Sequence, residues 1–318
     1  MEEKFLVTGG AGFIGSHIVE ALAKRGKKVR ILDNFSTGKM ENIEDFFKKY
    51  NNRNSLEVIK GDLRDKNTVD NAVKDVDYIF HLGALTSVFR SVEDTITTSE
   101  VNIIGTLNIL NAAKSSGVKR VIYASSSSAY GDSPKLPKKE EMETNPLSPY
   151  AVSKLACEDY CKVFKHLYGL ETVILRYFNV FGPRQDPDSQ YAAVIPKFIK
   201  MVLNNNKPTI YGDGEQTRDF TYIDNVVNAN LQALKKNGIL GEVFNIACGE
   251  KITINRLVKE IVDILNRDVN PIYSEPRKGD VRDSIADISK AKNLLGYKPK
   301  IGFRKGLENT VRFFSKKN

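Results

Sequence analysis

Short apolar runs alternate with amphipathic stretches along the first half of the chain. The runs are rich in Val, Ile and Leu, as in strands that a sheet buries on both faces. They lie at residues 4–8, 28–33, 56–60, 78–82, 121–124 and 172–176. Between them, apolar residues recur at helical spacing, most clearly over 98–116 and 150–168. This alternation predicts an α/β fold, a Rossmann-type doubly wound parallel sheet over residues 1–178.

The second half has a different pattern. It contains a turn-rich segment, two amphipathic helices, a tight turn and one more strand. The turn-rich segment lies at 182–188 and the two helices at 195–203 and 253–265. The tight turn lies at 212–214 and the strand at 243–246. We therefore predict a smaller α+β substrate lobe over residues 179–318, with segments that can return to the main sheet.

Three glycines, Gly9, Gly12 and Gly15, follow the first strand and open a helix. Glycines let the backbone turn tightly and approach a pyrophosphate, and a helix N-terminus offers free N–H groups to an anion. Asp33 ends the second strand, where a carboxylate binds ribose hydroxyls and repels a ribose phosphate. The pattern predicts NAD rather than NADP; the alternative is that these glycines serve only helix–strand packing.

Further polar and small residues lie at the carboxyl ends of predicted strands, where open parallel sheets bind ligands. Asp62 follows the third strand, and Gly83 and Ala84 follow the fourth. Asn102 is a polar residue early in the apolar helix 98–116. We expect contacts with the cofactor from these residues, although each alone could be a cap or turn residue.

Tyr150 and Lys154 are four residues apart in the helix that Pro149 opens, so they share one face. A Lys ammonium beside a phenol lowers the pKa of the phenol from about 10 towards neutrality. A tyrosine tuned in this way can remove a proton from a hydroxyl. The serines at 125–128 end the fifth strand and offer a hydroxyl to both substrate and Tyr150; four serines leave the assignment open.

The composition narrows the class of partner. The net charge is +9, from 48 basic and 39 acidic residues that are mixed along the chain. This favours small anionic ligands over nucleic acid. No apolar run approaches the ~20 residues of a membrane span. Three cysteines form no disulfide framework and indicate a reducing cytoplasm, and three scattered histidines predict no metal site.

Several motifs resemble those of extended short-chain dehydrogenases/reductases. They are the Thr8 to Gly15 loop, the Asp33 to Gly38 loop, the serine run that leads to Gly131, and Tyr150 with Lys154. The resemblance covers nearly the whole chain and is strongest to nucleotide-sugar epimerases, particularly UDP-N-acetylglucosamine 4-epimerases. The C-terminal motifs, at 212–220 and 278–290, narrow it to nucleotide sugars.

The resemblance implies a role for each matching residue. Ser126, Tyr150 and Lys154 would be catalytic. Contacts with NAD are expected at Gly9, Gly12, Phe13, Ile14, Gly15, Asp33, Asn34, Ser36, Thr37, Gly38, Asp62, Leu63, Leu82, Gly83, Ala84, Asn102, Tyr150, Lys154 and Tyr177. Contacts with the UDP-sugar are expected at Ser87, Ser126, Tyr150, Asn179, Gln185, Ala193, Val194, Lys197, Tyr211, Arg218, Arg277, Asp280 and Ser284.

Two features indicate the reaction and the sugar. No acidic residue stands beside Ser126, which argues against dehydratase and decarboxylase chemistry. Ser284 falls on the family's gatekeeper position near the sugar, and its small side chain would admit an N-acetyl group. We therefore expect NAD-dependent 4-epimerisation of UDP-GlcNAc and UDP-GalNAc, with UDP-Glc and UDP-Gal as further substrates.

The alternatives are a UDP-glucose or UDP-glucuronate 4-epimerase, a net NAD(P)-dependent sugar oxidoreductase, and a non-catalytic cofactor-binding protein. The resemblance also implies a homodimer, formed through the helices at 98–116 and 150–168.

Overall fold

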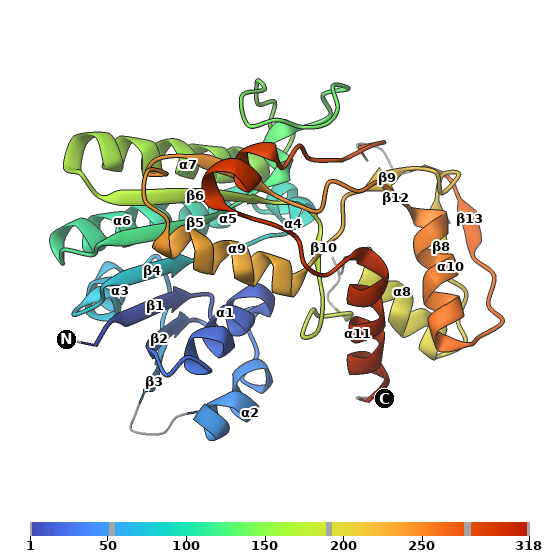
Figure 1. Cartoon of the computed structure of the whole chain (residues 1–318), viewed down its shortest axis with the longest axis horizontal. Helices are drawn as coiled ribbons and strands as arrows, with labels where there is room; N and C mark the ends of the chain where they lie inside the picture. The colour runs from blue at the N-terminus through green and yellow to red at the C-terminus, as the bar shows by residue number, and fades with distance from the viewer. Residues whose placement is uncertain (1, 51–54, 189–192, 277–280, 317–318) are drawn as a thin grey trace.

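A seven-stranded sheet forms the centre of the protein (Figure 1). The computed structural model describes residues 2–50, 55–188, 193–276 and 281–316. The sheet runs in the order β11-β6-β5-β4-β1-β2-β3, and every neighbouring pair is parallel. The strands are β1 (Lys4–Thr8), β2 (Lys28–Asp33), β3 (Leu56–Lys60), β4 (Tyr78–His81), β5 (Arg120–Ser126), β6 (Glu171–Tyr177) and β11 (Val243–Ile246). The predicted doubly wound fold is confirmed.

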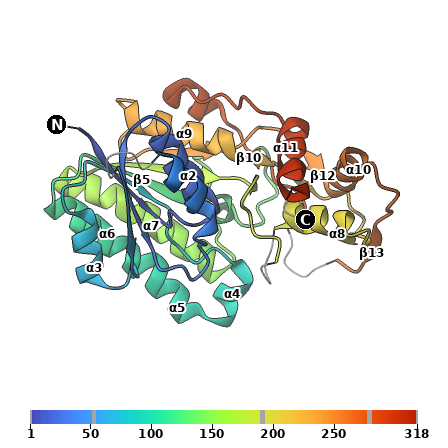
Figure 2. The same cartoon turned by 90° about the horizontal axis from the view of Figure 1, so that it is seen from below.

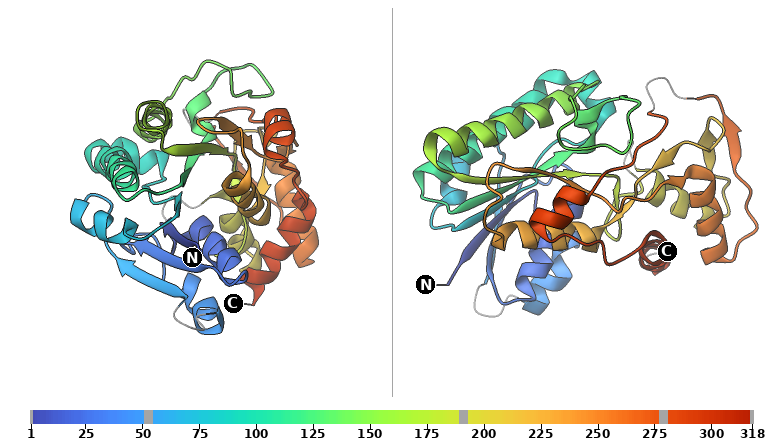
Figure 3. Two further views of the ribbon diagram at one scale, coloured as in Figure 1. Left: turned by 60° about the vertical axis from the view of Figure 1, so that its left-hand side comes forward. Right: turned by 45° about the horizontal axis from the view of Figure 1, so that its top comes forward.

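Helices cover both faces of this sheet (Figure 3). On one face lie α3 (Lys66–Val73), α6 (Gly105–Ser115) and α7 (Pro149–Tyr168), and on the other α1 (Phe13–Ala23), α2 (Glu41–Tyr50) and α9 (Ile223–Lys235). Successive strand residues point to opposite faces. Leu6 and Ile79 therefore join the core under α6, whereas Phe5 and Phe80 join the core under α1.

The predicted helix at 98–116 is not one regular α-helix. The structure has α5 (Thr95–Ser99), a π-helical turn (Glu100–Ile104) and then α6. Within the wider turn, the Asn102 amide hydrogen-bonds with both backbone groups of Leu85, at 2.8 and 3.0 Å, and donates to the Ser153 hydroxyl at 2.9 Å. These contacts, made across the chain, fix the irregular turn, so local spacing could not predict it.

The second lobe packs beside the carboxyl ends of the strands (Figure 2). Its helices α8 (Val194–Leu203), α10 (Ile254–Leu265) and α11 (Phe303–Ser315) contact one another. Three small sheets complete it: β7 (Val180–Phe181) with β10 (Thr221–Tyr222), β8 (Thr209–Tyr211) with β13 (Ile272–Ser274), and β9 (Thr217–Arg218) with β12 (Ile252–Thr253). The remaining short helical elements of the described residues are α4 (Val88–Glu93) and a 3-10 turn (Ser127–Tyr130) in the first half of the chain, and a π-helical turn (Ala291–Leu295) in the second.

Two elements from the second half belong to the main sheet layer. Strand β11 pairs with β6, and α9 packs on α1. The sequence anticipated the strand but not α9, nor the helices α2, α3, α4 and α11. The division into 1–178 and 179–318 remains a prediction. No helix of the described residues is long and apolar enough to span a membrane.

Candidate active site

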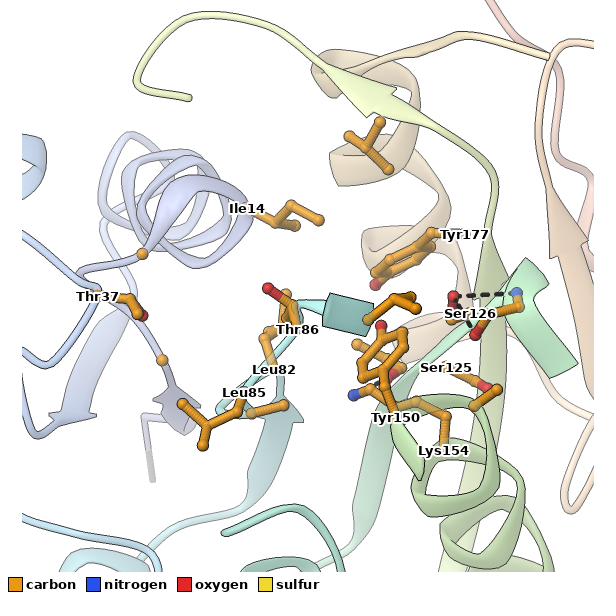
Figure 4. A pocket seen from close by; sticks show the side chains of 18 of the residues that line it. Ile14, Thr37, Leu82, Leu85, Thr86, Ser125, Ser126, Tyr150, Lys154 and Tyr177 are labelled. Carbon is orange, nitrogen blue, oxygen red and sulfur yellow. Dashed lines mark hydrogen bonds between the residues drawn. The ribbon is translucent and has the colours of Figure 1, made fainter. Parts of the chain in front are cut away.

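A cavity of about 1100 Å³ opens at the carboxyl ends of β1, β2, β4, β5 and β6 (Figure 4). It continues into a hollow of about 510 Å³ against α8. Phe89, Asn179, Gln185 and Arg218 line both. The two together form one long site between the sheet and the second lobe.

The glycine loop forms one end of the site. Gly9 has φ +64, and a Cβ there would lie 2.9 Å from the backbone of Gly83. A Cβ on Gly15 would lie 2.1 Å from the carbonyl oxygen of Gly9. Helix α1 starts behind Gly12, which provides no side-chain cap, so N–H groups of its first turn are available to an anion. The loop therefore fits the pyrophosphate of a dinucleotide.

Asp33 fixes this loop from the end of β2. Its carboxylate accepts the N–H groups of Ala11 and Phe35, at 2.9 and 2.8 Å. Burial raises the pKa of Asp33, and these two hydrogen bonds lower it in part. Gly38, for which we predict a contact with NAD, is not among the residues that line the cavity. A Cβ there would lie 2.7 Å from the Asp33 carboxylate, so this glycine makes room for Asp33.

Most predicted cofactor residues do line the cavity. They are Gly9, Gly12, Phe13, Ile14, Gly15, Asp33, Asn34, Ser36, Thr37, Asp62, Leu63, Leu82, Gly83, Ala84, Tyr150, Lys154 and Tyr177. Asn34 donates to the Asp62 carboxylate at 3.0 Å, and Arg64 beside it lowers the pKa of Asp62 to about 2. Asn102 is absent from the lining, because its amide is bonded to Leu85 and Ser153, and its contact with the cofactor stays a prediction.

Tyr150 and Lys154 enter the cavity from the first turns of α7. Pro149 occupies the first turn, and the Ser148 hydroxyl caps the helix by accepting the Ala151 N–H at 3.2 Å. Both functional side chains are buried. The Lys154 ammonium donates to the Ala124 carbonyl at 2.9 Å and lies 6.0 Å from the centre of the Tyr150 ring.

Burial opposes the lowering of the Tyr150 pKa that Lys154 is predicted to cause. Burial raises the pKa of Tyr150 above its usual 10, and the interaction with Ser126 lowers it only in part. Burial also lowers the pKa of Lys154 to about 8. The ammonium donates to the Ala124 carbonyl, and the lowering of the Tyr150 pKa by Lys154 stays a prediction.

The serines of the run differ in their hydrogen-bond partners. Ser125 donates to the Glu158 carboxylate at 2.5 Å. The Ser126 hydroxyl accepts hydrogen bonds from the N–H and the hydroxyl of Ser128, at 3.2 and 3.0 Å, and interacts with Tyr150. Figure 4 shows Ser126, Tyr150 and Tyr177 grouped at one end of the cavity. This geometry favours Ser126 as the hydroxyl partner of Tyr150.

Most of the predicted substrate residues line the two hollows, and Asn179, Gln185 and Arg218 line both. Asn179, Gln185, Arg218 and Ser284 line the larger one. The smaller one is lined by Ala193, Val194, Lys197 and Tyr211. Ser87 lines neither, because its hydroxyl caps α4 by accepting the Arg90 N–H at 3.1 Å. Arg277 and Asp280 lie outside the described residues.

Several lining residues escaped sequence reasoning, and two of them bear on the chemistry of the site. Phe89 follows the fourth strand and lines both hollows. Lys138 comes from a charged segment whose composition is typical of solvated surface, yet it is 2% exposed and lines the larger hollow. Its ammonium donates to the Ser133 carbonyl, and burial lowers its pKa. No local pattern distinguishes it from the exposed Lys139 beside it.

A glycine loop, the Asp33 carboxylate and a group of Ser126, Tyr150 and Lys154 in one cavity define an extended short-chain dehydrogenase/reductase. The model of the family described as GDP-mannose 4,6 dehydratase matches residues 6–310. The chain therefore belongs to that family.

Three solved structures support this placement. UDP-N-acetylglucosamine 4-epimerase from Methanobrevibacter ruminantium, in complex with UDP-N-acetylmuramic acid, is 46% identical, with a TM-score of 0.93 over 100% of both chains. UDP-glucose 4-epimerase from Thermotoga maritima, with UDP-glucose, is 42% identical, with a TM-score of 0.92 over 99% of both chains. UDP-glucose 4-epimerase from Thermus thermophilus, in complex with NAD, is 37% identical, with a TM-score of 0.87 over 98% of this chain and 99% of its own.

Proposed function

We propose that this protein is an NAD-dependent UDP-hexose 4-epimerase whose preferred substrates are UDP-GlcNAc and UDP-GalNAc. The observation that carries the proposal is that Tyr150 and Ser126 share one cavity with the glycine loop at one end and Ser284 in its wall. The similarity to UDP-sugar 4-epimerases supports the reaction.

The residues at the β1 and β2 ends fit NAD. Gly9 and Gly15 let the loop fold tightly against its own backbone, and both line the cavity at the start of α1. Asp33 places a carboxylate where a ribose phosphate would be repelled. When bound, NAD supplies the exchange of a hydride with sugar carbon 4. The Thermus thermophilus enzyme, which is in complex with NAD, supports the same cofactor here.

Tyr150 takes the proton from the sugar 4-hydroxyl and later returns it. Ser126, which interacts with the phenol, lowers its pKa and orients the hydroxyl group. Lys154 adds positive charge one helical turn away. No Asp or Glu stands in the serine run, so no acid is placed there to eliminate water from the sugar. The 4-keto sugar therefore returns to one of the two 4-epimers.

The preference for an N-acetyl sugar rests on Ser284. Its N–H donates to the Thr217 carbonyl at 3.2 Å, which holds it in the cavity wall beside Arg218. A serine leaves space that a tyrosine would fill. Asn179 and Gln185 add amide groups to the same wall.

One assay tests this proposal. Purified protein is given UDP-GlcNAc, UDP-glucose and UDP-glucuronate separately, and the products are separated by chromatography. We expect the highest kcat/KM with UDP-GlcNAc. Faster turnover of either other sugar would contradict the preference, and no turnover of any would contradict the reaction. Ser284→Tyr should lower kcat/KM for UDP-GlcNAc about tenfold or more and spare UDP-glucose.

A second candidate is UDP-glucuronate 4-epimerisation, which Lys138 favours. A buried ammonium in the cavity wall could bind the uronate carboxylate. Lys138→Met distinguishes the two candidates. If UDP-glucuronate is the substrate, the variant should lose about 100-fold in kcat/KM for it. Under the main proposal, turnover of UDP-GlcNAc should stay within about threefold of the wild type.

We also propose a cytoplasmic homodimer. Apolar side chains remain exposed along α5, its π-helical turn and α7, namely Ile96 (72%), Ile104 (48%), Val152 (49%), Val163 (44%) and Leu167 (61%). Helices α5 and α7 are neighbours, so these residues can form one apolar face. Three free cysteines suit a reducing compartment. Sedimentation should show a dimer that Val163→Lys with Leu167→Lys converts to monomer; an unchanged mass would contradict this interface.

A further inference from the structure

A buried ion pair joins α7 to β6 beneath the catalytic residues. The Glu158 side chain is 0% exposed and that of Arg176 is 3% exposed. Glu158 accepts from Arg176 through both carboxylate oxygens, at 2.8 and 2.7 Å. Neither residue lines the cavity, so neither has a place in substrate or cofactor binding. Burying two charges costs much of what their attraction returns, so stability alone is a weak reason for the pair.

The pair reaches the catalytic group through β5. Glu158 accepts a third hydrogen bond, from the Ser125 hydroxyl at 2.5 Å. One turn earlier on α7, Lys154 donates to the Ala124 carbonyl at 2.9 Å. Helix α7 thus holds the two strand residues that precede Ser126. Because Tyr150 lies on the same helix, these two hydrogen bonds between α7 and β5 fix the distance between its phenol and Ser126.

The pair also acts on Lys154, because the charge of Glu158 reaches this ammonium and Arg176 pairs with Glu158. The titratable groups that act on this ammonium, from β4, β5 and α7, are His81, Tyr123, Tyr150, Cys157, Glu158 and Cys161. Arg176 of β6 reaches it through its ion pair with Glu158. Burial raises the pKa of both tyrosines and both cysteines and lowers that of His81 to about 3. These five are therefore neutral near pH 8. The ion pair of Glu158 and Arg176 supplies the charge in this set.

We propose that Glu158 is a positioning residue of the reaction: balanced by Arg176, it sets the charge state of Lys154 and holds the end of β5 so that Ser126 faces Tyr150. This inference rests on the proposed epimerase function for its kinetic part. A purely structural ion pair would change stability when broken but would leave the ionisation of Lys154 where it is.

The test compares Glu158→Gln with Arg176→Met. Removing the carboxylate leaves Arg176 as an extra cation, which should move the alkaline limb of the kcat/KM profile down by about one pH unit. Removing the guanidinium leaves Glu158 unbalanced, which should move the limb up by about the same amount. The substrate is whichever UDP-sugar the wild type turns over fastest, so the outcome does not depend on sugar preference.

A matched control lies at the other end of the same strands. Arg120 of β5 and Glu171 of β6 form an ion pair at 2.8 Å. Glu171→Gln should lower stability and leave the pH profile unchanged. Limbs that stay fixed, or that move in the same direction, in the two test variants would overturn the proposal.

Ser125→Ala removes the hydrogen bond between β5 and Glu158 without breaking the ion pair. It serves as the test if Glu158→Gln and Arg176→Met fail to fold. It should lower kcat about tenfold or more and leave KM within about threefold; a wild-type kcat would overturn the proposal. If the wild type turns over no UDP-sugar, the proposed function fails separately. In that case Glu158→Gln and Arg176→Met are compared by pH titration of tyrosinate absorbance in the NAD-loaded protein. The signal of Tyr150 is obtained by subtracting the titration of the same protein with Tyr150→Phe, and the two variants should shift its pKa in opposite directions. Identical titrations would overturn the proposal.

Discussion

Replacement of Lys154 by Met should separate stability from activity. The Lys154 side chain is buried, and its ammonium has the Ala124 carbonyl as a hydrogen-bond acceptor. Burial lowers the pKa of Lys154 from 10.5 to about 8. The unfolded chain therefore holds this proton more tightly than the folded chain does, and the charged lysine opposes folding.

The size of the effect follows from this pKa. A shift from 10.5 to about 8 costs the folded state about 3 kcal/mol, because one pH unit is worth about 1.4 kcal/mol. The cost is fully present below about pH 8 and is relieved as pH rises towards 10.5. Methionine removes this cost but leaves the Ala124 carbonyl without its donor, which costs about 1–3 kcal/mol at every pH.

Urea unfolding of cofactor-free wild type and Lys154→Met measures both parts. At about pH 7 the variant should equal or exceed the wild type in stability, by up to about 2 kcal/mol. By about pH 10 its relative stability should have fallen by about 2 kcal/mol. Its kcat should be lower by about 10²–10⁴. A stability difference that does not change with pH would refute the buried charge, and a near-normal kcat would refute its role.

Three further substitutions test the site. Tyr150→Phe should lower kcat by about 10²–10⁴ while NAD affinity stays within about threefold, as titration calorimetry can show; normal turnover would remove Tyr150 from the mechanism. Gly15→Ala places a Cβ 2.1 Å from the Gly9 carbonyl oxygen and should abolish NAD binding, whereas the control Gly302→Ala, with open space around it, should bind normally. Asp33→Asn should weaken NAD binding and narrow the preference for NAD over NADP about tenfold or more; an unchanged ratio of affinities would contradict the assigned role.

The fold was predictable where short-range pattern and burial agree. Strands β1 and β6 are buried on both faces, so consecutive apolar residues fill the middle of each, at 5–7 and 173–175. Helix α2 could not be recognised in this way, because its sequence is mostly polar and only Ile43 and Phe46 are buried. The π-helical turn is held by hydrogen bonds between Asn102 and Leu85, which belong to separate segments, so local sequence could not predict it.

The candidate site shows the same limit. Spacing placed Tyr150 and Lys154 on one face of α7, and the structure agrees. Spacing could not show that the ammonium would turn to the Ala124 carbonyl, because that acceptor comes from β5. Nor could it separate Ser125 from Ser126, since the difference lies in Glu158 of another element. Lys138 became a cavity residue only through the packing of its loop.

The fate of the hydrogen on sugar carbon 4 is the most direct test of the proposed reaction. UDP-GlcNAc carrying deuterium at that carbon is incubated with the protein, and the products are followed by NMR while absorbance reports free NADH. We expect UDP-GalNAc with deuterium retained at carbon 4 and no NADH in solution. Loss of the deuterium, stoichiometric release of NADH, or the absence of any 4-epimer would contradict epimerisation by internal hydride return.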